Sequence, residues 1–196
     1  MEELLGNGLF PCPGCGGRLG GWGHAVRRRV FAEGRLPAAV RPRRARCSSC
    51  GVTHVLLPSW LLSRRCDGTA VIGDMLARAA RGQGFRSIAA ASGVPGDTVR
   101  DRLRRFRFSA ARIREFFTRL AGVLAADPVP LDPAGGPLAD AVVAVAAAAA
   151  AAGGRWPGMI TVSGWELSAV LTAGSLLSPS VSFARVREDA PLPALA

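Results

Sequence analysis

The segment GFRSIAAASGVPGDTVRDRLRRF, residues 84–106, decides the fold of the central part of this chain. Apolar residues at helical spacing predict two helices, over 85–92 and 95–107, joined by a tight turn. Gly93 suits that turn because a positive φ costs glycine little, and Pro95 suits the first turn of the second helix because its missing N–H costs nothing there. This order of helix, turn and helix is a helix-turn-helix signature.

The second of these helices has two distinct faces. Val99, Leu103 and Phe106 form its buried stripe, and the opposite face carries Asp97, Arg100, Asp101 and Arg104, flanked by Arg102, Arg105 and Arg107. In a helix-turn-helix protein this face enters the major groove, where arginine can bind guanine, aspartate can accept from cytosine, and flanking arginines suit phosphates. The alternative is a helical hairpin without DNA function, in which Asp101 simply pairs with Arg105.

Outward from this segment the chain predicts an α+β protein that is mostly α. Amphipathic spacing predicts helices over 69–81 and about 109–125, and the alanine tract 139–152 favours a helix by propensity. In the apolar stretch 159–178 we expect a helix in the second half. The expected units are a β zinc ribbon over 1–60, a helix-turn-helix domain over 67–126, a linker over 127–137, an alanine-rich helical segment over 138–180 and a disordered tail over 181–196. The apolar segment 138–180 suits self-association as a homodimer, or packing on the rest of the chain.

Two cysteine pairs indicate a metal site. Cys12 and Cys15 lie in CPGCG, Cys47 and Cys50 lie in CSSCG, and 31 residues separate the pairs. A two-residue spacing lets one turn aim both sulfurs at one point, and two such turns complete a closed Cys₄ site for one structural Zn²⁺ with no open position for catalysis. We expect Cys66 to be a small buried residue, and His54 to be an ordinary strand residue rather than a ligand.

The charge distribution predicts a polyanion partner. Every basic residue is arginine; residues 1–120 hold 22 arginines against 8 acidic residues, whereas residues 121–196 hold 3 against 6. Seven of the arginines between the cysteine pairs form two clusters: Arg27, Arg28 and Arg29, then Arg41, Arg43, Arg44 and Arg46. They favour a phosphate-binding surface, with a merely solvated strand face as the alternative.

The expected location is the cytoplasm, associated with the nucleoid. The start, MEELLGNGLF, is acidic where a secretory signal would be basic, so we expect reduced cysteines that bind metal. The uncharged run 141–154 is too short to cross a bilayer, and we expect no membrane partner.

The motifs CPGCG, RPRRARCSSCGVTHVLLP and GVPGDTVRDRLRRF together resemble the DNA-binding front end of insertion-sequence transposases. They also resemble small actinobacterial transposase-like proteins that carry this front end alone. The resemblance covers about residues 10–125 and implies metal on the four cysteines and DNA on the 95–107 helix. It does not extend to catalysis, because a transposase core needs three carboxylates on an RNase H-like fold. The acids that precede the last residues of the tail are few and lie mostly around the linker: Asp127, Asp132, Asp140 and Glu166.

We therefore expect a zinc-stabilised protein that binds double-stranded DNA, has no catalytic residues and takes no small-molecule substrate. It would act as a transcriptional regulator or as a non-catalytic accessory of a mobile element. Two alternatives stay open: a truncated transposase with retained or recruited nuclease chemistry, and a zinc-ribbon module whose arginines meet acidic protein partners.

Overall fold

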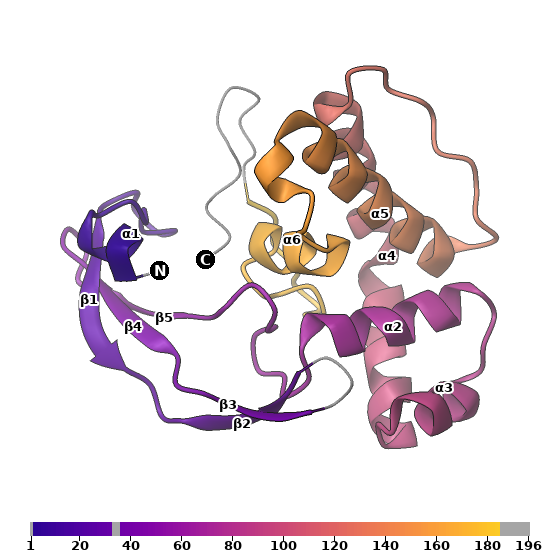
Figure 1. Ribbon diagram of the computed structural model, residues 1–196, viewed down its shortest axis with the longest axis horizontal. Helices are drawn as coiled ribbons and strands as arrows, with labels where there is room; N and C mark the ends of the chain where they lie inside the picture. The colour runs from indigo at the N-terminus through magenta and orange to yellow at the C-terminus, as the bar shows by residue number, and fades with distance from the viewer. Residues whose placement is uncertain (1, 33–35, 185–196) are drawn as a thin grey trace.

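A computed structural model describes residues 2–32 and 36–184 and divides into a β-rich N-terminal part and a helical C-terminal part (Figure 1). The N-terminal part contains α1 (Glu2–Gly6), β1 (Leu19–His24), β2 (Arg28–Phe31), β3 (Pro37–Val40), β4 (Arg43–Cys47) and β5 (Thr53–Leu56). The helical part contains α2 (Thr69–Ala80), α3 (Phe85–Ser92), α4 (Gly96–Leu124), α5 (Pro137–Arg155), the 3₁₀ turn η2 (Pro157–Met159) and α6 (Gly164–Leu171). This is a mixture of helices and small sheets in which helix dominates, as the sequence predicts.

The strands form two separate antiparallel sheets. One has three strands in the order β1-β4-β5, and the other is the β2-β3 hairpin, in which Arg28 lies opposite Val40. The three-stranded sheet has a small apolar core of its own, where Leu5 of α1 packs with Leu19, Ala45 and the cysteines Cys12 and Cys47. Because this core is so small, the cysteine cluster at its edge has to contribute to its stability.

The β2-β3 hairpin is fastened to the segment that leads into α2. The Phe31 amide donates to the Cys66 carbonyl at 2.7 Å, and the Gly68 amide donates to the Phe31 carbonyl at 2.8 Å. In Figure 1 the hairpin accordingly runs from the three-stranded sheet toward the helical part. The arginine-bearing hairpin is thus tied to both halves of the molecule.

The predicted helices over 69–81 and 85–92 are confirmed as α2 and α3, but the next two are one helix. α4 continues without a break for 29 residues, from Gly96 to Leu124, where we expected separate helices over 95–107 and about 109–125. No glycine or proline interrupts residues 97–121, and the buried stripe continues at helical spacing from Phe106 through Ala110 to Ile113.

The turn between α3 and α4 has the expected chemistry. Gly93 adopts the left-handed conformation with φ of 64°, which a side chain would disfavour, and its amide donates to the Ala89 carbonyl at 2.9 Å. Val94 is buried in the core, and Pro95 stands at the position before the first helical residue of α4. This turn fixes the angle at which α3 meets the beginning of α4.

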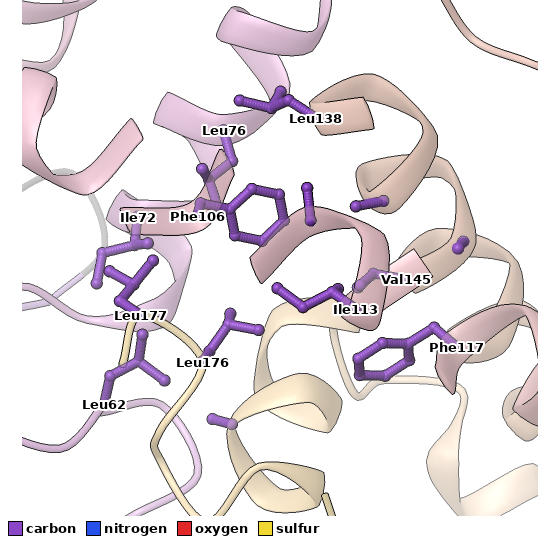
Figure 2. Packing of buried hydrophobic residues seen from close by; sticks show 14 of the residues in the cluster. Leu62, Ile72, Leu76, Phe106, Ile113, Phe117, Leu138, Val145, Leu176 and Leu177 are labelled. Atoms are coloured by element: carbon purple, nitrogen blue, oxygen red, sulfur yellow. The ribbon is translucent and has the colours of Figure 1, made fainter. Parts of the chain in front are cut away.

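The alanine-rich α5 packs along α4 in the same core as α2 and α3 (Figure 2). Ala141, Ala144 and Ala148 of α5 are fully buried in this core, where their small side chains let the two helices approach closely. Among the described residues, α5 is the one helix that is long and apolar enough to cross a membrane by length and composition, but its buried face is used inside the chain. Of the two uses expected for this segment, packing on the rest of the chain is what the structure displays.

The C-terminal segment differs from the prediction in two places. The helix in the 159–178 stretch is α6, in its middle rather than its second half, because Ser163 and Glu166 form a capping box that starts it there. Residues 181–184, which we expected to be disordered, are packed: Val181 is buried, and Phe183 stacks on Phe116 with ring centroids 4.4 Å apart. The remainder of the expected disordered tail, 185–196, lies outside the described residues.

Candidate metal centre and basic surface

Each cysteine pair lies on a tight turn that ends in a left-handed glycine. The Gly16 amide donates to the Cys12 carbonyl at 2.8 Å, and the Gly51 amide donates to the Cys47 carbonyl at 3.1 Å. The two glycines have nearly the same φ, 73° and 72°, a conformation that glycine adopts without strain. The two turns are therefore repeats of one local structure, as the repeated CxxCG pattern predicts.

Pairing of β1 with β4 brings the two turns together. The four sulfurs of Cys12, Cys15, Cys47 and Cys50 all lie within 4.8 Å of one another, although 31 residues separate the pairs in sequence. The Cys12 and Cys50 sulfurs are 3.8 Å apart, and those of Cys15 and Cys47 are 3.5 Å apart. These residues can hold one metal ion, and no disulfide joins them.

The protons of this cluster are unevenly distributed. The Cys50 amide donates to the Cys47 sulfur at 3.4 Å, and that bond, with a second from the Ser49 amide at 3.3 Å, lowers the pKa of Cys47 to about 6. Gly17 acts in the same direction on Cys15, but the neighbouring sulfurs of Cys47 and Cys50 outweigh it and raise the pKa of Cys15 to about 12. Adjacent thiolates repel one another, and a cation among them would relieve that repulsion.

His54 and Cys66 differ from what we expected. His54 does lie on a strand, β5, but its Nε2 is 3.4 Å from the Cys12 sulfur, so the imidazole borders the cluster and can hydrogen-bond a ligand. A histidine three residues after CxxCG was the available signal. Cys66 is exposed rather than buried, because it belongs to the connection that pairs with Phe31, and its sulfur lies 3.7 Å from an oxygen of Asp67.

The beginning of α4 carries exposed arginines that are paired along the helix. Arg100 and Arg104 expose 62% and 76% of their side chains, Arg100 pairs with Asp97, and Arg104 pairs with Asp101 at 2.7 Å. Asp101 also accepts from Arg105 at 2.6 Å, and these hydrogen bonds from Arg105 and Arg104 hold the pKa of its carboxyl below the usual value. The charge pairing that we weighed as the alternative to DNA contact is thus present, but it leaves both arginines facing solvent.

Arg102 is not where we expected it. Its side chain is 5% exposed and forms an ion pair with Asp67, whose side chain is 2% exposed, so it cannot contact a phosphate at the surface. Its helical position, between the buried stripe and the exposed face, turns it toward the segment before α2. Arg107, in contrast, is exposed as expected.

The seven clustered arginines between the cysteine pairs do not form one uniform surface. Arg27, Arg29 and Arg41 are exposed on or beside the β2-β3 hairpin, whereas Arg28 and Arg44 are partly buried. Arg43 is also partly buried, and this corrects its expected role: its guanidinium donates to the Gly23 carbonyl at 2.7 Å and pairs with Glu2 at 2.9 Å, bracing β1 and α1. Arg46 lies over the Trp22 ring, 4.8 Å from its centroid, at a groove of about 580 Å³ beside the Cys47–Cys50 turn.

The acids of the C-terminal part take structural positions. Asp140 pairs with Arg114 at 3.2 Å and accepts from the Ala134 amide at 2.7 Å, and Glu166 caps α6. Asp127 and Asp132 are exposed in the segment between α4 and α5. Within residues 2–32 and 36–184, the cysteine cluster is the one group of three or more potential metal ligands brought together.

These features define a chain with a four-cysteine β-rich part, compatible with a zinc ribbon, joined to a helical bundle with a basic surface. A family described as a domain of unknown function (DUF6431) matches residues 12–92. The matched region begins at Cys12 and includes all four cysteines, α2 and α3, and it ends just before the turn into α4. Neither the curated proteins nor the solved structures contain a match to this chain.

Proposed function

We propose that this protein binds double-stranded DNA through α4 and that a zinc ion stabilises its β-rich part. It would act as a transcriptional regulator or as a non-catalytic accessory of a mobile element. The observation that carries the proposal is the pair of exposed arginines one helical turn apart at the beginning of α4, directly after a tight turn that sets α4 against α3.

The zinc proposal is supported by the sulfur spacing. A tetrahedral zinc site with Zn–S bonds of about 2.3 Å has sulfurs about 3.8 Å apart. The Cys12–Cys50 and Cys15–Cys47 distances of 3.8 and 3.5 Å are close to that value. Four thiolates are soft ligands that favour zinc over magnesium or calcium, and they leave no position for a catalytic water. The ion would stabilise the two turns and would have no catalytic role.

The DNA proposal is supported by the contacts that hold the Arg100 side chain in place. Arg100 lies over the Phe85 ring of α3, 5.1 Å from its centroid, and Asp97 pairs with it from the first turn of α4. These contacts restrict the guanidinium before any partner arrives, which reduces the entropy lost on binding. In helix-turn-helix proteins the first turns of the second helix contact base edges, and a guanidinium can bind two acceptors of guanine.

The basic hairpin gives a second reason to propose DNA. Asp67 lies in the segment that pairs with Phe31 of the hairpin, and its buried ion pair with Arg102 joins that segment to α4. The exposed arginines Arg29 and Arg41 on and beside the hairpin are thereby held in a constant relation to α4. A duplex bound by α4 could then also be contacted through its phosphates by the hairpin.

The experiment is to select preferred sequences from random DNA and to compare Arg100→Ala with Arg119→Ala, a matched control. Arg119 is exposed on the same helix and is paired within it, with Glu115, but lies five turns further along. Arg100→Ala should weaken binding to the preferred site by about 1–3 kcal/mol and change binding to random DNA little. Equal losses on both DNAs, or losses equal to those of Arg119→Ala, would contradict a reading role for α4.

The metal proposal is tested separately by elemental analysis of the purified protein. We expect about one zinc per chain, and less than half an equivalent with freely titratable native thiols would contradict the site. For the absence of catalysis, a metal-dependent strand-transfer assay on the selected DNA should yield no joined product; a product would favour the truncated-transposase alternative.

A further inference from the structure

A second concave site lies on one flank of α4, at Arg105. The pocket has a volume of about 470 Å³ and is formed by three segments that are distant in sequence. Arg64 and Arg65 come from the connection before α2, Arg105 comes from α4, and residues 174–180 come from the turns that follow α6. The Ser63 amide donates to the Gly174 carbonyl at 2.9 Å, which joins the first and third segments.

The pocket carries an excess of positive charge. Among the described residues, three arginines line it and no acidic residue does, and Asp101, which pairs with Arg105, is shared with Arg104. Asp67 already forms a buried ion pair with Arg102. Burial, followed by the positive charges of Arg105 and Arg102, lowers the pKa of Arg65 below its usual value. Like charges held together in this way are relieved when an anion binds between them.

Hydrogen-bond donors in the pocket are left for a ligand. Arg65 reaches the Leu177 carbonyl only at 3.5 Å, which is a weak bond, and within the described part of the chain the Arg64 guanidinium has no partner. The Ser178 and Ser180 hydroxyls lie 3.3 Å apart, and because only one of them can donate in that bond, the other O–H remains available. Guanidinium and hydroxyl donors together match the oxygens of a phosphate group.

We propose that this pocket binds a phosphate group. One of its arginines, Arg105, shares Asp101 with the exposed Arg104, which favours a backbone phosphate of a duplex lying on α4, and this source rests on the proposed function. A free phosphorylated small molecule offers the same chemistry and would instead make the pocket an effector site. Both sources bring the same oxygens to Arg64, Arg65 and Arg105.

The test compares the zinc-loaded wild type with Arg64→Gln/Arg65→Gln and with Arg119→Gln as the matched arginine control. Inorganic phosphate is titrated in an amide-detected NMR experiment at constant ionic strength. We expect saturable shifts at Ser63–Arg65 and 174–180 in the wild type and in Arg119→Gln, and an affinity at least tenfold lower in the double variant. A native-like amide spectrum of the double variant without phosphate confirms its fold; if it misfolds, Arg105→Gln alone replaces it.

DNA binding at several salt concentrations distinguishes the two sources. A backbone phosphate in the pocket should reduce the salt slope of the double variant by about one unit relative to Arg119→Gln, whereas a free ligand should leave the two slopes equal. Phosphate binding by a wild type that fails to bind DNA would support the pocket and overturn the proposed function. Absence of saturable phosphate shifts together with equal salt slopes would overturn the pocket, as would phosphate binding that the double variant retains.

Discussion

The buried ion pair between Asp67 and Arg102 offers a sharp test of how the two parts of the chain are joined. Replacing Asp67 by Asn keeps the shape of the side chain and removes its charge, which leaves the Arg102 guanidinium, 5% exposed, without its anion. Breaking one partner of a buried pair costs about 3–5 kcal/mol, because the remaining charge is neither solvated nor compensated. For a chain of 196 residues that loss lowers the melting temperature by roughly 6–20 °C.

Urea denaturation of the zinc-loaded protein, followed by circular dichroism, measures this loss. The matched control is Asp74→Asn, which removes a carboxylate from an exposed pair with Arg78 on α2 and should cost under about 1 kcal/mol. A double variant, Asp67→Leu with Arg102→Met, should recover most of the stability, because apolar groups of similar volume need no counter-ion. If Asp67→Asn costs no more than Asp74→Asn, the pair does not hold the connection on α4 and the reasoning is refuted.

Four further predictions concern packing and metal. Gly73→Ala should lose about 1–3 kcal/mol, because a Cβ at this helical position would overlap the Trp165 indole, whereas Gly122→Ala, at an open helical position, should gain about 0.5–1 kcal/mol; thermal melts compare the two. Phe106→Ala, at a fully buried ring in the helical core, should lose about 3–5 kcal/mol in urea titrations, and a loss below 1 kcal/mol would contradict its burial. Cys47→Ser should abolish metal binding and the amide dispersion of β1, β4 and β5 while α2–α5 keep their helical signal, because metal binding and folding are coupled locally. His54→Ala should weaken zinc binding by about 10–100-fold in a chelator competition, since partners of metal ligands tune affinity, and an unchanged affinity would mean that the imidazole only borders the cluster.

Local features of the fold were predictable from the sequence because they depend on neighbours a few residues apart. The repeated CxxCG turns, the left-handed glycine between α3 and α4, and the helices α2 and α3 all follow from spacing and from the special conformational freedom of glycine. The union of two expected helices into α4 shows the limit of that reasoning. We expected a boundary near residue 108, but the buried stripe continues from Phe106 to Ala110 and no glycine or proline ends the helix there.

What the sequence by itself determined is the set of four cysteines that can hold a metal ion, the helices α2 and α3 and the concentration of arginine in the first 120 residues, because each depends only on residue type and spacing. The tertiary structure decided which arginines remain at the surface. Arg102 and Arg104 are the same residue type two positions apart on α4. Arg102 is nevertheless buried against Asp67 and Arg104 faces solvent, because the segment before α2 covers one flank of α4 and not the other. The same packing brings Arg64 and Arg65 beside Arg105 and residues 174–180, a pocket that no local pattern could indicate because its first and last segments are distant in sequence.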